Sequence, residues 1–514
     1  MSGLRPSRLE DLLSASVQQH GDRLAVESPE LRLSYAELAE EAAACADRIA
    51  AAGCRPGEAV LLAVDNDSRD VAGQFAAWRT RAVAVPVPRS ASASTVRSTA
   101  ERTGARLLLG RRLPAPWHDL VEDDGPAADV RALRRPGRGR PSELGADQAL
   151  VVFTSGSTGR PKGVVLSHRG FARKLDAIQR LLPFAPGTAM WQALQLNFSF
   201  GQWTSLLTLA SGGTLRLRPK FSVSGLLRAL AEGEADRVAV VPSMLRMVLS
   251  RLDRPDGEDL LAGIGAAAAP KLWIAGGEPL PAAVGRAVRE RFPHAGLADV
   301  YGLSESSTSD LILTPDRYDR EAGTIGRPTS GVEVRVVGPR GEDRPRGEAG
   351  ELWVRTEHLM TGYLGDPEAT AAAVTGGWLR TGDLARYRSG DGLLELTGRA
   401  KHLIVRGGNK ISPVEVENVF NAHPDCGACV AVGRPDAVLG ERVALLMVPR
   451  AGRDVDPLQV LSWAGERMDR HQLPDTVHLI EGLPLGRTGK VDRERSRALA
   501  ARLGAGRPAE AGHG

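Results

Sequence analysis

The chain has 514 residues, of which 42% are hydrophobic and 25% charged, and its formal net charge is +4. This composition is typical of a globular protein, and the length predicts at least two domains. No apolar run is long enough for a membrane span, and the N-terminus lacks the apolar stretch of a secretory signal, so we expect a cytoplasmic protein without stable membrane insertion. The small net charge argues against nucleic-acid binding, and we interpret the short basic run 134–141 as a solvated loop.

The first part of the chain alternates helical and strand patterns. The segment "SYAELAEEAAACADRIAAAG" begins with Ser34, carries Glu37 three residues later and ends with Gly53, which predicts a well-capped helix. Apolar runs that predict buried strands, several of them ending in Gly or Ser turns, are "AVLLAV", "AVAVPVP", "ALVVFTSG", "DRVAVVPS", "KLWIAGGE" and "LADVYGLSE". This alternation predicts an α/β fold of parallel-rich sheets flanked by helices, with ligands at the carboxyl ends of the strands.

The pattern changes after about residue 320. "TIGRPTSGVEVRVVG", "GELWVRT" and "GLLELTGR" predict a small β lobe of short strands and tight turns. After Gly398 the pattern becomes compact α+β, so we predict a large N-terminal domain over 1–398, a small C-terminal domain over 399–503 and a disordered tail over 504–514. Cys426 and Cys429 form a CxxC without a second pair, and we interpret them as small core residues entering a strand.

The densest functional signal is "TSGSTGRPKG", which begins at Thr154 directly after an apolar strand pattern. Its glycines allow close backbone approach, and its hydroxyls and amides could form an anion-binding nest. The spacing differs from a Walker A loop, because Lys162 follows Arg-Pro and is followed by Gly163. The chain has only seven lysines against 59 arginines, so each lysine is a better than usual candidate for a role that needs a compact ammonium.

The loop resembles the phosphate-binding loop of the adenylate-forming superfamily, which comprises acyl- and aryl-CoA synthetases, adenylation domains of peptide synthetases, and luciferases. The resemblance recurs in the family's order at "WIAGGEPLP", "VYGLSESS", "GELWVRTEHLMTGYLGDPEAT", "GWLRTGDLARY", "GRAKHLIVRGGNKISPVEVE" and "LPLGRTGKVDR". It covers nearly the whole chain and implies a large N-terminal domain followed by a small mobile C-terminal domain. The implied reaction is attack of a carboxylate on the α-phosphorus of ATP, followed by attack of a thiol on the acyl-adenylate.

The resemblance also implies roles for individual residues. Lys490 would be the catalytic cation at the α-phosphate, Glu305 a catalytic residue and Mg²⁺ ligand, and Ser304, where most relatives carry Thr, a catalytic hydroxyl. Lys401 would be the hinge, and Gly407 and Gly408 would line the path of the thiol. The remaining ATP-binding residues would be Thr154, Ser155, Gly156, Ser157, Thr158, Gly159, Lys162, Gly276, Gly277, Glu278, Tyr301, Gly302, Asp383 and Arg399.

The stretch "LQLNFSFGQW" corresponds to the part of the family that contacts the acid. Amino-acid-activating relatives usually carry an Asp where this chain has Ser199, so we expect a carboxylic acid without an α-amino group. The histidine found here in many CoA ligases is also absent. The predicted pocket is therefore largely apolar and suited to an aromatic acid, with lining residues Asn197, Phe198, Ser199, Phe200, Trp203 and Gly276.

The sequence leaves two candidates for the acceptor thiol. "RGGNKISPVEVE" looks more like CoA ligases than modular peptide synthetases, and no carrier domain follows within the chain, so we expect coenzyme A. The alternative is the phosphopantetheine of a separate carrier protein in natural-product biosynthesis. A hydrolysing NTPase would release orthophosphate instead of pyrophosphate, and nothing in the sequence supports a luciferase-like oxygenase.

Overall fold

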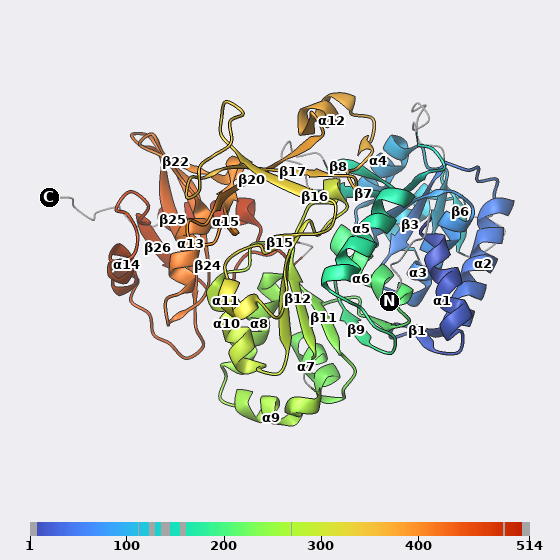
Figure 1. Cartoon of the computed structure of the whole chain (residues 1–514), viewed down its shortest axis with the longest axis horizontal. Coiled ribbons are helices and arrows are strands. Elements are labelled where there is room, and N and C mark those ends of the chain that lie inside the picture. Colours follow the sequence, from blue (N-terminus) through green and yellow to red (C-terminus); the bar gives the residue numbers. More distant parts are fainter. Residues whose placement is uncertain are drawn as a thin grey trace.

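The computed structural model describes residues 8–111, 113–122, 129–134, 144–154, 161–268, 270–486 and 489–505. The N-terminal elements lie at one end of the molecule and the C-terminal elements at the other, with the elements of the middle of the chain between them (Figure 1). Within the described residues, no helix combines the length and the apolar character needed to cross a membrane.

Two large sheets form the N-terminal part. The nine-stranded sheet has the order β15 (Arg327–Pro328), β14 (Leu311–Leu313), β13 (Gly296–Tyr301), β12 (Leu272–Gly276), β11 (Arg237–Val240), β9 (Ala189–Gln192), β10 (Thr214–Leu217), β1 (Leu24–Glu27) and β2 (Arg32–Ser34). The seven-stranded sheet has the order β18 (Gly362–Tyr363), β8 (Lys162–Ser167), β7 (Gln148–Thr154), β4 (Val83–Pro88), β3 (Ala59–Val64), β5 (Leu107–Leu109) and β6 (Val130–Ala132). In both sheets the central strands are parallel and the edges antiparallel, which confirms the predicted parallel-rich α/β fold.

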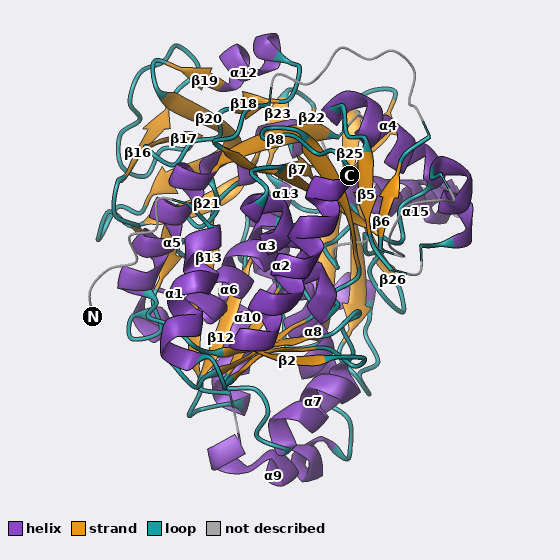
Figure 2. Ribbon diagram, turned by 90° about the vertical axis from the view of Figure 1, so that its right-hand side faces the viewer, coloured by secondary structure: helices purple, strands orange, loops and turns teal. Residues whose placement is uncertain are grey.

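Helices fill the space between the two sheets. The helices of the shared core are α1 (Glu10–His20), α2 (Tyr35–Ala51), α3 (Ser68–Arg79), α5 (His168–Leu181) and α6 (Ser199–Ala210). They pack against both sheets in the largest apolar cluster of the described residues, and Figure 2 shows this crowded helical layer. The same cluster continues to the far face of the nine-stranded sheet, where it includes Leu226, Leu245 and Val284. The outer faces carry α4 (Ala93–Thr103) and the 3₁₀ helix η1 (Ala115–Leu120) on one sheet, and α7 (Val223–Ala231), α8 (Pro242–Leu252), α9 (Gly257–Ala268) and α10 (Ala282–Arg291) on the other.

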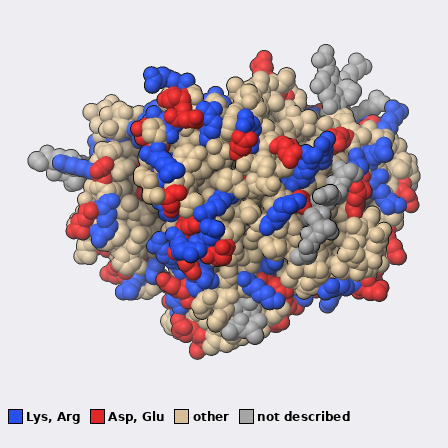
Figure 3. Space-filling model, viewed as in Figure 1, with Lys and Arg blue, Asp and Glu red and all other residues tan. Residues whose placement is uncertain are grey.

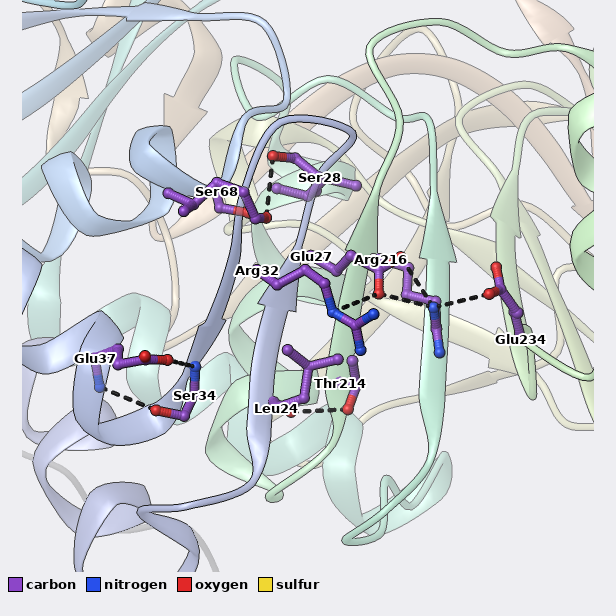
Figure 4. Close-up of polar contacts among 12 residues, drawn as sticks. Leu24, Glu27, Ser28, Arg32, Ser34, Glu37, Ser68, Thr214, Arg216 and Glu234 are labelled. Atoms are coloured by element: carbon purple, nitrogen blue, oxygen red, sulfur yellow. Dashed lines mark hydrogen bonds and ion pairs between the residues drawn. The ribbon is translucent and has the colours of Figure 1, made fainter.

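The predicted helix after Ser34 shows how local sequence fixes an element. The Ser34 hydroxyl accepts from the Glu37 amide, and the Glu37 carboxylate accepts from the Ser34 amide, so α2 begins with the predicted capping box. Beside it, Arg216 of β10 forms ion pairs with Glu27 of β1 at 2.9 Å and with Glu234 at 3.3 Å, which fastens the edge of the nine-stranded sheet (Figure 4).

Two smaller sheets complete the chain. The first is antiparallel and has the order β16 (Val332–Val337), β17 (Gly350–Thr356), β20 (Trp378–Tyr387) and β19 (Val374–Thr375), with β21 (Leu394–Arg399) paired to β20. The second has the order β23 (Asn409–Ile411), β22 (Ile404–Arg406), β25 (Gly440–Pro449) and β24 (Cys426–Asp436), with β26 (Thr476–Leu479) paired to β25. The remaining helices are η2 (Ser304–Ser306), α11 (Tyr318–Glu321), α12 (Pro367–Ala373), η3 (Ala400–His402), α13 (Pro413–Asn421), α14 (Pro457–Gly465) and α15 (Arg493–Ala505).

The chain passes from one small sheet to the other through η3, close to the predicted boundary at residue 398. Cys426 and Cys429 lie at the start of β24 and are buried, as predicted for core residues. The predicted tail begins inside α15, which continues to Ala505, and residues 506–514 lie outside the described residues. On the face shown in Figure 3, Lys and Arg side chains are interspersed with Asp and Glu.

Candidate functional site

Strand ends from the nine-stranded sheet and the first small sheet meet at one place. Tyr301 ends β13, and its hydroxyl donates a hydrogen bond of 2.8 Å to Oδ2 of Asp383 in β20. Arg399, the register partner of Asp383 at the end of β21, donates to both carboxylate oxygens. Burial and the Asp383 carboxylate raise the pKa of Tyr301, so its hydroxyl stays a donor. The structure therefore brings three predicted ATP-binding residues into direct contact.

Lys490 reaches this place from the far end of the chain. A Cβ placed on Gly277 would lie 3.1 Å from Lys490 Nζ, so the ammonium lies against the backbone at the end of β12. Gly277 has a φ of 84°, a second reason for glycine at this position. Burial lowers the pKa of Lys490, while the negative charges of Glu278 and Asp383 act in the opposite direction. A half-buried ammonium in this position can stabilise negative charge that develops beside it.

The loop that carries Lys490 is held by the N-terminal part. The Val491 amide donates to Oε1 of Glu278 at 2.7 Å, and the Ser243 hydroxyl donates to the Gly489 carbonyl. Burial raises the pKa of Glu278, which the Val491 amide and the Lys490 ammonium oppose. Glu278 therefore links the position of the loop to the charge of the lysine that it carries.

Glu305 lies in η2, immediately after β13. Its backbone carbonyl accepts from the Met360 amide at 2.7 Å, and its Oε1 accepts from the Tyr363 hydroxyl at 2.8 Å. Gly302 permits this tight loop, because a Cβ there would lie 2.1 Å from the Ser309 nitrogen. The Tyr363 hydroxyl thus fixes the direction of the carboxylate, and the Met360 amide holds the backbone that carries it.

The predicted phosphate loop is described only at its ends. Thr154 ends β7 and pairs in register with Lys162, which begins β8. Ser155, Gly156, Ser157, Thr158 and Gly159 lie outside the described residues. The Lys162 ammonium lies 4.5 Å from the centre of the Tyr363 ring, whose hydroxyl reaches Glu305. Tyr363 thus connects the predicted phosphate lysine with the predicted metal ligand. No role for Tyr363 is predicted from the sequence, although "MTGYLGD" is part of one of the family motifs.

The predicted acid pocket is built on the first turns of α6. The Ser199 hydroxyl lies 3.1 Å from the Ser304 hydroxyl, so the first residue of α6 touches the predicted catalytic loop. The Phe200 ring stacks on Trp203 with a centroid distance of 5.6 Å, and its edge lies 3.3 Å from where a Gly276 Cβ would be. Asn197, Phe198, Ser199 and Phe200 are half-buried, whereas Trp203 is fully buried behind Phe200.

The predicted hinge and thiol-path residues are exposed. Lys401 is exposed in η3, two residues after Arg399. Gly407 and Gly408 form the exposed turn between β22 and β23, with left-handed φ values of 55° and 84°. A side chain at either position would be strained, and a Cβ at Gly408 would meet open space.

A metal ion would find one fixed carboxylate here. Among the described residues, no group of three or more His, Cys, Asp or Glu side chains could hold a metal by itself. Mg²⁺ is usually held by one or two carboxylates together with substrate phosphates and water, so a single oriented carboxylate such as Glu305 fits that ion.

Comparison with known families gives the site its context. A family model described as AMP-binding enzyme matches residues 13–364, and one described as AMP-binding enzyme C-terminal domain matches residues 415–490. The chain belongs to the AMP-binding enzyme family. The resemblance to adenylate-forming enzymes is thereby confirmed, and the two matched segments lie on either side of the junction at η3.

Several relatives of this AMP-binding enzyme match over most of their length. A feruloyl-CoA synthase from Amycolatopsis sp is 32% identical over 486 residues, which cover 89% of this chain and 92% of the relative. An indoleacetate–CoA ligase from Aromatoleum aromaticum is 30% identical over 506 residues, covering 93% and 96%.

Solved structures agree with the fold. An amide bond synthetase from Marinactinospora thermotolerans superposes with a TM-score of 0.82 at 27% identity, covering 96% of this chain and 99% of the other. An anthranilate CoA ligase in complex with anthranoyl-AMP has a TM-score of 0.83 at 21% identity, covering 98% and 99%, and that likeness shows the fold alone.

Proposed function

We propose that the protein activates an amine-free, largely apolar or aromatic carboxylic acid with ATP and transfers the acyl group to the thiol of coenzyme A. In the first step a carboxylate oxygen bonds to the α-phosphorus and pyrophosphate leaves. In the second step the thiol sulfur bonds to the acyl carbon, the thiol proton is lost and AMP leaves. The observation that carries the proposal is the convergence of Lys490 with Glu278, Asp383 and Arg399, because this charge arrangement suits attack on a phosphate ester.

Each part of the site has a proposed task in the first step. Asp383 accepts hydrogen bonds from the ribose hydroxyls, and the Tyr301 ring stacks on the adenine. Lys162 and the loop that begins at Thr154 grip the β- and γ-phosphates, so that they leave together as pyrophosphate. Lys490 contacts both the attacking carboxylate and the α-phosphate, and stabilises the charge that moves between them.

Glu305 is the residue that would hold Mg²⁺, and the bound ion would neutralise charge on the phosphates. Its carboxylate is already oriented by the Tyr363 hydroxyl, so little reorganisation is needed when the metal–nucleotide complex binds. Ser304, joined to Ser199, offers a hydroxyl at the junction between the phosphates and the acid.

The acid specificity follows from the pocket's chemistry. Ser199 and its neighbours offer no carboxylate to a substrate ammonium, so an amino acid would leave an uncompensated buried charge. The half-buried Phe200 ring stacked on Trp203 offers an apolar wall suited to a planar acid. The names of the feruloyl-CoA and indoleacetate–CoA relatives support both the aromatic class and CoA as the acceptor.

An acid panel in an ATP–pyrophosphate exchange assay tests the proposal. We expect exchange with aryl or arylacrylic acids and none with the corresponding α-amino acids. If no carboxylic acid supports exchange, the proposal is wrong. AMP release is then measured with CoA and, separately, with purified carrier proteins bearing phosphopantetheine, since release with carrier protein alone would identify the stand-alone loading enzyme instead.

A further inference from the structure

A buried ion pair lies behind the loop that carries Glu305. Nζ of Lys174, in α5, lies 2.7 Å from Oδ1 of Asp310, which follows that loop, and both side chains are 0% exposed. Burial lowers the pKa of Lys174 and raises that of Asp310, while each charge opposes the shift of the other. Apolar side chains of similar volume often stabilise a fold as well as a buried ion pair does, so this pair needs a reason beyond stability.

The pair is connected directly to the residue after Glu305. The second oxygen of Asp310, Oδ2, accepts a hydrogen bond from the buried hydroxyl of Ser306. The Asp310 carbonyl accepts from the Thr329 amide at 2.8 Å, which fixes the backbone on the far side. Asp310 thus joins α5, η2 and the residue that follows β15 through one buried side chain and its own backbone.

The intervening backbone is strained. Ser307, Thr308 and Ser309 have φ values of 58°, 74° and 41°, three consecutive residues other than glycine in the left-handed region. Such residues avoid this region unless surrounding contacts impose it. The Ser307 hydroxyl donates to the His358 carbonyl at 2.6 Å, but the anchors at the two ends of the turn are Ser306 and Asp310.

We propose that Lys174 and Asp310 are positioning residues that set the direction of the Glu305 carboxylate toward the metal–nucleotide complex. They act through Ser306 and the left-handed turn, and touch neither substrate nor metal. The inference rests on the proposed function of Glu305 as the Mg²⁺ ligand. It adds to that function a buried pair of residues that lie 136 positions apart in the chain.

The test replaces both charges together. The double variant Lys174→Met/Asp310→Leu removes the ion pair without leaving a single buried charge, and we expect it to fold with an unfolding temperature near that of the wild type. Calorimetry then measures ATP binding with and without Mg²⁺. We expect the affinity gained from Mg²⁺ to fall on the order of 10-fold, and pyrophosphate exchange to fall by about 10²-fold because the carboxylate is misplaced.

Ser306→Ala is the second variant, because it keeps the ion pair and removes the hydroxyl that donates to Asp310 and lies 3.1 Å from the Leu303 carbonyl. We expect the same effects in smaller size, about threefold, as for one lost hydrogen bond. The matched control is Arg173→Ala/Glu357→Ala, which removes an exposed ion pair formed by the residue next to Lys174 in α5, and we expect no change beyond about twofold.

Attack of CoA on a supplied acyl-adenylate provides the readout that separates positioning from general damage, since pyrophosphate and its metal have left by that step. We expect the double variant to keep this half-reaction. The inference is wrong if the folded double variant gains as much ATP affinity from Mg²⁺ as the wild type does. It is also wrong if the double variant loses the two half-reactions equally. If the wild type binds ATP with Mg²⁺ but no acid supports exchange, the proposed function fails, and the binding data still decide the inference.

Discussion

The Lys490→Ala variant separates the two half-reactions. The Lys490 side chain is half-buried against the end of β12, and the charges of Glu278 and Asp383 act on its ammonium, so water screens that ammonium only in part. Removing one preorganised donor to a developing negative charge typically costs about 10²–10³-fold in rate. We expect the upper end of that range, about 10³-fold or roughly 4 kcal/mol at 1.36 kcal/mol per tenfold, because the ammonium contacts both the attacking carboxylate and the α-phosphate in the proposed first step.

Two assays measure this variant. ATP–pyrophosphate exchange follows adenylate formation, and CoA-dependent AMP release from a supplied acyl-adenylate follows thioester formation. We expect the first to fall about 10³-fold and the second to stay within about threefold, because the thiol does not need the ammonium at the α-phosphate. Lys271→Ala is the control, since this lysine is 75% exposed and pairs with Asp236 on the surface. Equal loss of both half-reactions in a folded Lys490→Ala protein would refute the assigned role.

Three further predictions follow from the same contacts. Burial lowers the pKa of Lys490, and the reaction needs its charged form, so pyrophosphate exchange should decline as the pH rises, at a lower pH than an ordinary lysine would give. Glu278→Gln removes a charge that raises this pKa, so the decline should begin at still lower pH; an unchanged pH–rate profile would count against the coupling. Asp383→Ala should weaken ATP binding by about 1.5–3 kcal/mol, as for a hydrogen bond to a charged group, and calorimetry that finds unchanged affinity would contradict its ribose contact. Ser199→Asp should lower kcat/KM for an aryl acid on the order of 10-fold or more, because the new carboxylate would be desolvated beside the substrate; unchanged kinetics would show that position 199 lies outside the pocket.

Local patterns were enough to predict much of the fold. The capping box at Ser34 and Glu37 needs only three residues of spacing, and the apolar runs that became β3, β7 and β12 are buried on both faces as their continuous apolar character indicates. Ordered motifs then placed Tyr301 and Asp383 in one site, although only the structure shows that they touch.

Long-range contacts could not be read in the same way. The hydrogen bond from Tyr363 to Glu305 arises because β18 pairs with β8, which brings a two-residue strand beside a loop 58 positions earlier. Lys174 is one of only seven lysines in an arginine-rich chain, but nothing in the helical segment around it indicates that it pairs with Asp310, 136 positions later. Trp203 was predicted to line the pocket but is fully buried, because the hydrophobic periodicity of a helix does not distinguish a pocket wall from the core behind it.

The way the Lys490 loop is docked bears on the predicted mobility of the C-terminal part. The buried apolar clusters that contain the C-terminal sheet include no described residue before Ile404, so this part keeps its own core. Its contacts with the site include polar ones, from Ser243 to the Gly489 carbonyl and from the Val491 amide to Glu278. Such contacts can be exchanged for water without opening a shared apolar core, at a far smaller cost in free energy. A rotation near the predicted hinge Lys401 would therefore withdraw the ammonium and leave both cores intact, so that a thiol could approach the acyl carbon in the proposed second half-reaction.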